Sequence, residues 1–130
     1  MQEKKTALIA GASGIVGRGI AERLVGDGWR VLCASRSGGG HLPGTEGVAV
    51  DLLDAEACAR AVAPHAGITH VFHAAFQPAP SRAAEVAPNL AMLRNVVEAV
   101  QQASPALRKV VLVTGAKFYG IQWGASSTPC

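Results

Sequence analysis

Seven consecutive residues, Gly11-Ala12-Ser13-Gly14-Ile15-Val16-Gly17, have the composition of a phosphate-binding turn. They follow the apolar run Ala7–Ala10 and precede apolar residues at helical spacing, so a buried strand would lead through the turn into a helix. Gly11 would allow the tight turn, Gly14 the approach of a pyrophosphate, and Gly17 close packing of the helix on the sheet. The N-terminus of the helix would face the anion. Because both flanking elements are present, the motif predicts a dinucleotide site rather than only a turn.

The residues at the end of the second predicted strand, Ser35-Arg36-Ser37, bear on which dinucleotide would bind. An acidic side chain at this position would accept hydrogen bonds from the adenosine ribose and repel a 2′-phosphate. A guanidinium beside small hydroxyls suits a phosphate instead, since arginine offers a rigid fork of N–H donors. We therefore expect Arg36 and Ser37 to bind the 2′-phosphate of NADP(H). The alternative is an ordinary solvated arginine at a strand end.

Acidic residues after the third predicted strand have two alternative roles. Asp51 would accept a hydrogen bond from the adenine amino group while Leu52 packs on the ring. Alternatively, Asp51 or Asp54 would only cap the next helix, because a carboxylate accepts hydrogen bonds from the free N–H groups of a first turn. The two roles are compatible, with Asp54 as the cap and Asp51 on the base.

The fourth predicted strand ends in His73-Ala74-Ala75. Small side chains there would let a cofactor cross the strand end, in the crevice where such sheets bind ligands. We therefore include Ala75 and the following Phe76 in the expected site. His73 lies within an apolar strand, and we expect a hydrogen-bonded core histidine rather than an acid or a base.

A lysine and a tyrosine lie in the segment Thr114–Tyr119, which follows the fifth predicted strand at the same edge as the glycine turn. Some dehydrogenases use a tyrosine hydroxyl to handle the proton and a lysine to hold the ribose. Those enzymes usually arrange the pair as Tyr-x-x-x-Lys, but the residue four after Tyr119 is Trp123, so that motif is absent. On position alone, Lys117 is equally well explained as a surface lysine.

The elements that must position these residues alternate between strand and helix. The expected strands are 6–10, 30–34, 47–50, 70–75 and 109–114, and the expected helices are 15–26, 55–63 and 85–103, with a loop over 37–47. The apolar face of the last helix would consist of Leu90, Leu93, Val96, Val97 and Val100. Apolar strands separated by helices indicate a parallel sheet covered on both faces. We expect an α/β fold, a Rossmann-type doubly wound parallel sheet of order 3-2-1-4-5, truncated after the fifth strand.

Composition narrows the class of protein. The net charge of +3 comes from scattered basic residues, which makes nucleic acid a poor candidate ligand. Cys33, Cys58 and Cys130 lack metal-ligand spacing, so we expect no metal and a reducing, cytoplasmic compartment. The N-terminus runs straight into a strand without a signal peptide, and no apolar stretch reaches membrane-spanning length.

Several segments spread over nearly the whole chain match one family: Gly11–Gly17, Arg36, Asp51-Leu52, His70–His73, Asn89–Val97 and Thr114–Gly120. With them the chain resembles the N-terminal part of extended short-chain dehydrogenases, especially the progesterone 5β-reductase/iridoid synthase-like group of NADPH-dependent enone reductases. The resemblance implies that Lys117 is catalytic, because that group has a catalytic lysine in a Thr-Gly-x-Lys-x-Tyr segment. The partner tyrosine of that group lies in a segment beyond Cys130.

The favoured hypothesis is an NADP(H)-binding oxidoreductase domain over residues 1–120, followed by an irregular tail over 121–130. It would act on a small carbonyl or enone substrate, and a homodimer is the assembly that we consider. The alternatives are a nucleotide-sugar epimerase or dehydratase and a dinucleotide-binding module without chemistry. The expected catalytic residue is Lys117, and the expected cofactor-binding residues are Gly11, Ser13, Gly14, Ile15, Val16, Gly17, Arg36, Ser37, Asp51, Leu52, Ala75, Phe76, Val113 and Thr114.

Overall fold

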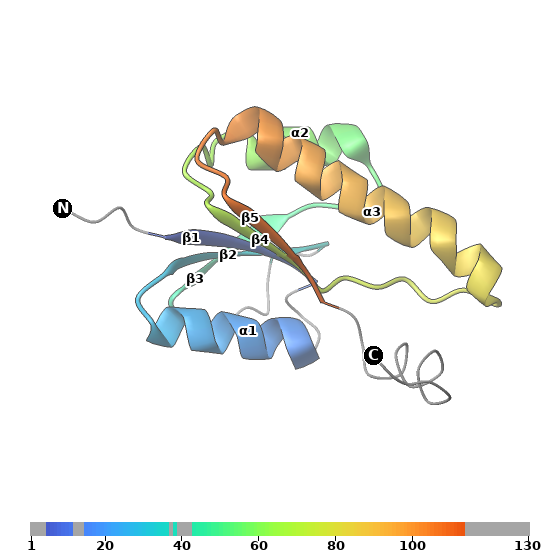
Figure 1. The fold of residues 1–130 in the computed structure, drawn as a ribbon, viewed down its shortest axis with the longest axis horizontal. Helices are drawn as coiled ribbons and strands as arrows, with labels where there is room; N and C mark the ends of the chain where they lie inside the picture. The colour runs from blue at the N-terminus through green and yellow to red at the C-terminus, as the bar shows by residue number, and fades with distance from the viewer. Residues whose placement is uncertain (1–4, 12–14, 37, 39–42, 114–130) are drawn as a thin grey trace.

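The computed structural model describes residues 5–11, 15–36, 38 and 43–113, in which strands and helices alternate except that β3 follows β2 (Figure 1). In chain order the elements are β1 (Thr6–Ala10), α1 (Ile15–Gly26), β2 (Arg30–Ser35), β3 (Thr45–Ala49), α2 (Ala55–Val62), β4 (His70–His73), α3 (Arg82–Ala103) and β5 (Lys109–Leu112).

The strands form one parallel sheet in the order β3-β2-β1-β4-β5, which confirms the predicted topology. The central strand β1 pairs with β2 through Ala7↔Val31 and with β4 through Ala7↔His70. Because every crossover returns through a helix or loop to a parallel neighbour, the carboxyl ends of the strands gather at one edge of the sheet.

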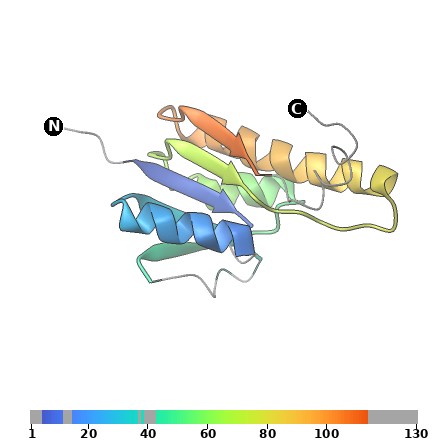
Figure 2. The same ribbon diagram turned by 60° about the horizontal axis from the view of Figure 1, so that its bottom comes forward.

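Helices cover both faces of the sheet, with α1 on one side and α2 and α3 on the other (Figures 1 and 2). Alternate residues of each strand therefore enter two separate cores. The core under α2 and α3 contains Leu8, Ala10, Leu32, Ala34, Val48, Val50, Cys58, Val62, Ile68, Val71, Val96, Ala99 and Val100. The core under α1 contains Ala7, Ile9, Ala21, Leu24, Val31 and Cys33.

The two cysteines of the described residues lie in different cores. Cys33 belongs to the core under α1 and Cys58 to the core under α2 and α3. Burial raises the pKa of both thiols, because a low-dielectric surrounding disfavours the thiolate.

Several predicted boundaries differ from the structure. β3 begins at Thr45 rather than Gly47, since Thr45 and Glu46 pair with Val31 and Leu32 although neither is apolar. α3 begins at Arg82 rather than residue 85, because Ser81 caps it by accepting a hydrogen bond from the Ala84 N–H (3.1 Å). The strands predicted over 70–75 and 109–114 end at His73 and Leu112.

The buried face of α3 agrees only in part with the predicted one, since Val96 and Val100 are buried as expected. It consists of Met92, Val96, Ala99 and Val100, whereas Leu90 is 53% exposed. Leu93 and Val97 are only half-buried. Both sets of residues recur at steps of three and four, so spacing alone did not distinguish the face that meets the sheet.

A buried hydroxyl joins β1 to β4 at the amino edge of the sheet. Thr69 Oγ1 accepts a hydrogen bond from the Thr6 N–H and donates one to the Thr6 carbonyl, both at 3.0 Å. Both residues are buried, so water cannot replace these bonds without opening the structure.

We expect Thr69→Val to lower the free energy of unfolding by about 1–3 kcal/mol, because the buried Thr6 N–H loses its partner, whereas the Thr6 carbonyl keeps its bond from the Thr69 N–H (2.9 Å). Thr69→Ser keeps the hydroxyl and should cost less. Urea titrations of the two variants and the wild type measure the difference. Coinciding transitions for wild type and Thr69→Val would contradict this role of the hydroxyl.

Candidate functional site

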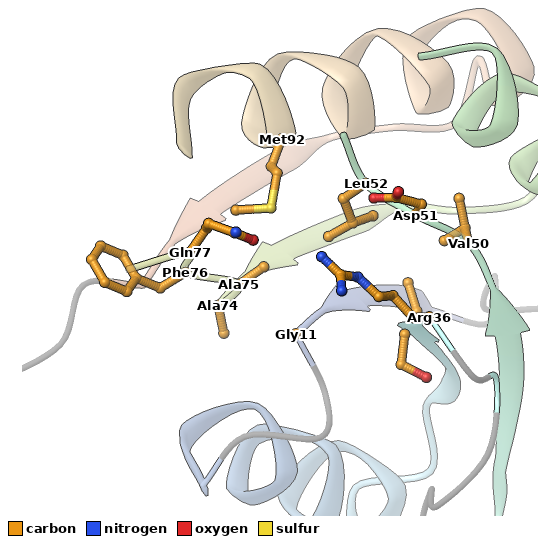
Figure 3. Close-up of a pocket in the computed structure, with 12 residues that line it drawn as sticks. Gly11, Arg36, Val50, Asp51, Leu52, Ala74, Ala75, Phe76, Gln77 and Met92 are labelled. Carbon is orange, nitrogen blue, oxygen red and sulfur yellow. The ribbon is translucent and has the colours of Figure 1, made fainter. Parts of the chain in front are cut away.

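A groove of about 670 Å³ lies at the carboxyl edge of the sheet, where β1, β2 and β4 end (Figure 3). This is the edge at which open parallel sheets bind their ligands. Its volume falls within the usual range for a small-molecule site. The residues that line it are Gly11, Ala34, Ser35, Arg36, Val50, Asp51, Leu52, Ala74, Ala75, Phe76, Gln77 and Met92.

Gly11 lines the groove without a side chain. Its φ of 85° lies in the left-handed region, and a Cβ built on it would lie 2.5 Å from the Ala75 nitrogen. Glycine is therefore required for two reasons, the turn after β1 and the close approach of the chain that leaves β4. The sequence predicted the first reason but not the second.

Arg36 extends from the end of β2 into the groove (Figure 3). Its side chain is exposed, and it forms no ion pair within the described part of the chain. Ser35 beside it accepts a hydrogen bond from the Gly38 N–H at 3.1 Å, which ties the start of the following loop to β2. The guanidinium is thus available to an anion in the groove.

Asp51 and Leu52 form the wall of the groove after β3. Asp51 Oδ1 accepts a hydrogen bond from the Leu53 N–H (3.0 Å), so the carboxylate is oriented by its own turn. Asp54 caps α2 by accepting a hydrogen bond from the Ala57 N–H (3.0 Å), which confirms that predicted role. The cap is therefore Asp54, and the exposed carboxylate of Asp51 lies on the groove.

The opposite wall is the chain from Ala74 to Gln77, between β4 and α3. The Ala74 N–H donates to the Ala10 carbonyl (2.8 Å), which extends the pairing of β4 with β1 by one residue. Phe76 is 57% exposed, and Met92 of α3 points toward this wall (Figure 3). This end of the groove is thus more apolar than the end that carries Arg36 and Asp51.

His73 is buried and lies outside the groove-lining set, with 3% of its surface exposed. Its burial agrees with the expected core histidine. Its Nδ1, however, has no hydrogen-bond partner within the described part of the chain. Burial lowers the pKa of His73, because the charged imidazolium is poorly solvated there.

The predicted site residues divide into three groups. Those that line the groove are Gly11, Arg36, Asp51, Leu52, Ala75 and Phe76. Those described but not lining it are Ile15 (93% exposed), Val16 (50% exposed), Gly17, which is a buried residue of α1, and Val113. Those outside the described residues are Ser13, Gly14, Ser37, Thr114 and the predicted catalytic Lys117, together with the predicted tail over 121–130.

Sequence reasoning did not assign Ala34, Ser35, Val50, Gln77 and Met92 to the site. Ala34, Ser35 and Val50 were predictable, because they end or follow parallel strands at the same edge as Gly11. Gln77 and Met92 could not be assigned from the sequence, because the path of a loop brings Gln77 to the groove and the orientation of α3 brings Met92 there. Among the described residues no cluster of side chains suits a metal ion, and no helix is long and apolar enough to cross a membrane.

The sheet order and the groove at its carboxyl edge define a Rossmann-type domain. A sequence model of the NAD dependent epimerase/dehydratase family matches residues 7–128, so the chain belongs to this family. The chain is also similar to a solved structure from Burkholderia cenocepacia J2315, with 30% identity, a TM-score of 0.73, and coverage of 89% of this chain and 39% of that one.

Two curated relatives confirm the resemblance that the motifs indicated. The chain is 34% identical to a 3-oxo-Delta(4,5)-steroid 5-beta-reductase of Arabidopsis thaliana, over 89% of this chain and 32% of the relative. It is 31% identical to an (S)-8-oxocitronellyl enol synthase of Antirrhinum majus, over 93% of this chain and 32% of the relative. The chain thus spans about a third of the length of these relatives.

We expect Gly11→Ala to lower the free energy of unfolding by about 1–3 kcal/mol, through the positive φ and the clash with the Ala75 backbone. Gly19→Ala is the matched control, because a Cβ at this exposed α1 position would have nothing within 4 Å. It should raise stability by about 0.5–1 kcal/mol. Thermal and urea unfolding measure both variants, and equal effects of the two would refute the close approach.

Proposed function

We propose that the groove binds NADP(H), with the adenosine half between Arg36 and the Asp51-Leu52 wall. The observation that carries the proposal is the guanidinium of Arg36 in the groove. Its neighbours in the sequence at the end of β2 are serines rather than an acidic residue. A 2′-phosphate would receive charge-assisted hydrogen bonds from Arg36, whereas an acid would have repelled it. Leu52 would pack on the adenine, and Asp51 would accept a hydrogen bond from the amino group of the adenine.

The rest of the groove fits a dinucleotide that continues past β1. Gly11 lines the groove with backbone alone, because a Cβ there would clash with the backbone of Ala75. α1 begins just after this turn, so its first N–H groups and the residues 13–17 of the glycine motif are proposed to bind the pyrophosphate. The remaining half would then lie toward Ala75 and Phe76, with Val113 and Thr114 beyond.

We further propose that the whole protein is an enone reductase, in line with its similarity to the Arabidopsis 5-beta-reductase. Bound NADPH would supply a hydride to the β-carbon of an α,β-unsaturated carbonyl. The proposed role of Lys117 is to act as the catalytic residue of this chain. The exposed Phe76 and the neighbouring Met92 offer an apolar surface at this end of the groove.

A nucleotide-sugar epimerase or dehydratase is the second candidate, because the matching family model is described as NAD dependent epimerase/dehydratase. The two candidates differ in cofactor as well as in substrate. Arg36 favours NADP(H) and hence the reductase. A cytoplasmic location and a homodimer stay predictions, to be tested by cell fractionation and light scattering.

For the cofactor, we expect NADP(H) to bind more tightly than NAD(H), and Arg36→Ala to weaken NADP(H) about tenfold or more, through loss of roughly 1.5–3 kcal/mol. NAD(H) affinity should hardly change, because it lacks the 2′-phosphate. Arg94→Ala removes the same charge at an exposed position of α3 that does not line the groove, and it is the control. Calorimetric titration measures the affinity of each of the three proteins for each cofactor. Equal NADP(H) affinity in wild type and Arg36→Ala would remove Arg36 from the site.

For the reaction, we expect the whole protein to oxidise NADPH in the presence of a small enone, and Lys117→Ala to lose this activity while still binding NADPH. The present chain alone should bind cofactor without turnover. Absorbance at the reduced-nicotinamide band follows the reaction, and mass spectrometry identifies the saturated product. Turnover of a nucleotide sugar instead of an enone would favour the epimerase or dehydratase.

A further inference from the structure

The wall from Ala74 to Gln77 needs support from outside its own backbone. The chain between β4 and α3 is irregular and contains Pro78 and Pro80, which donate no N–H. Phe76 is 57% exposed, so packing holds it only in part. The backbone groups of such a segment must find partners among side chains, other strands or water.

Asn89 of α3 supplies those partners at Gln77. Its Oδ1 accepts a hydrogen bond from the Gln77 N–H (2.8 Å), and its Nδ2 donates to the Gln77 carbonyl (2.9 Å). Nδ2 also donates to the Glu85 carbonyl of the preceding helical turn (2.8 Å). The amide thus pairs both backbone groups of one residue, as a neighbouring strand would, and is itself fixed by the helix.

The other end of the wall is fixed to β1. The Ala74 N–H bonds to the Ala10 carbonyl, and the chain at Ala75 lies against Gly11 without room for a side chain. The segment from Ala75 to Gln77 therefore spans two anchored points. Since the first anchor belongs to the sheet, Asn89 decides where the second one lies.

α3 holds the opposite wall as well. Asn95 Nδ2 donates to the Leu52 carbonyl (2.8 Å), and Met92, midway between the two asparagines, lines the groove. Asn95 comes six positions after Asn89 in the helix, which corresponds to a rise of about 9 Å. One rigid helix thus carries the anchors of both walls, which fixes the distance between them.

We infer that Asn89 is a positioning residue that holds the Ala75–Gln77 wall against the nicotinamide half of the dinucleotide. The inference rests on the proposed function, which assigns the adenosine half to the Arg36 and Asp51 end. Asn89 would act through Gln77 and not by contact with the cofactor, since it is absent from the groove lining. Substitution of Asn89 should therefore weaken the binding of the nicotinamide half and leave the binding of the adenosine half unchanged.

The test compares NADPH with 2′,5′-ADP, which carries the adenosine half and its phosphate but no nicotinamide. In the complete protein, Asn89→Leu should weaken NADPH about tenfold, because an unanchored wall must be ordered on binding, and leave 2′,5′-ADP affinity unchanged. Gln101→Leu, an exposed amide on the same helix, is the matched control and should change neither affinity.

A second variant covers the case in which Asn89→Leu does not fold. Asn89→Asp keeps the size and the acceptor for the Gln77 N–H but loses the donors to the Gln77 and Glu85 carbonyls. It should weaken NADPH in the same selective way. Equal weakening of both ligands, or of neither, would overturn the positioning role. A wild type that binds neither ligand would overturn the proposed function itself.

Discussion

The close contact between Gly11 and Ala75 is the constraint on which the groove depends. β1 is the central strand, and its pairing with β4 continues past the last ladder residue through the Ala74 N–H and the Ala10 carbonyl. With no Cβ at Gly11, the chain at the end of β1 and the chain that leaves β4 lie side by side. The floor of the groove is therefore backbone, and the side chains that could recognise a ligand come from its rims.

The two edges of the sheet are held by different means. At the amino edge, buried hydroxyls join elements: Thr69 bonds to Thr6, and Ser104 bonds to the carbonyls of Ala66 and Ile68 at 2.7 and 2.6 Å. At the carboxyl edge, the rims are exposed and their backbones are held by side-chain amides from α3. Rigidity at one edge thus supports an open, polar surface at the other, as a binding site requires.

The sequence predicted the features that local chemistry determines. The apolar runs of β1, β2 and β4 and the glycine turn were enough to place the elements and the strand order. The start of β3 was misjudged because Thr45 and Glu46 are polar, and only the structure shows that they pair with β2, where Glu46 also forms an ion pair with Arg30 (2.8 Å). The face of α3 was predicted only in part, with Val96 and Val100 buried as expected, because several apolar residues share the helical spacing. Gly11, Arg36 and Asp51 were found from their positions at strand ends, whereas Asn89 and Gln77 meet only through tertiary structure.

The two buried cysteines lie on opposite sides of the sheet, so each can report on the opening of one side. Cys33 is covered by the layer that contains α1, and Cys58 by the layer that contains α2 and α3. Because both thiols are buried and protonated, each meets an alkylating reagent only when its own layer opens. The rates at which the two sulfurs are modified therefore report separately on how often each side of the sheet opens.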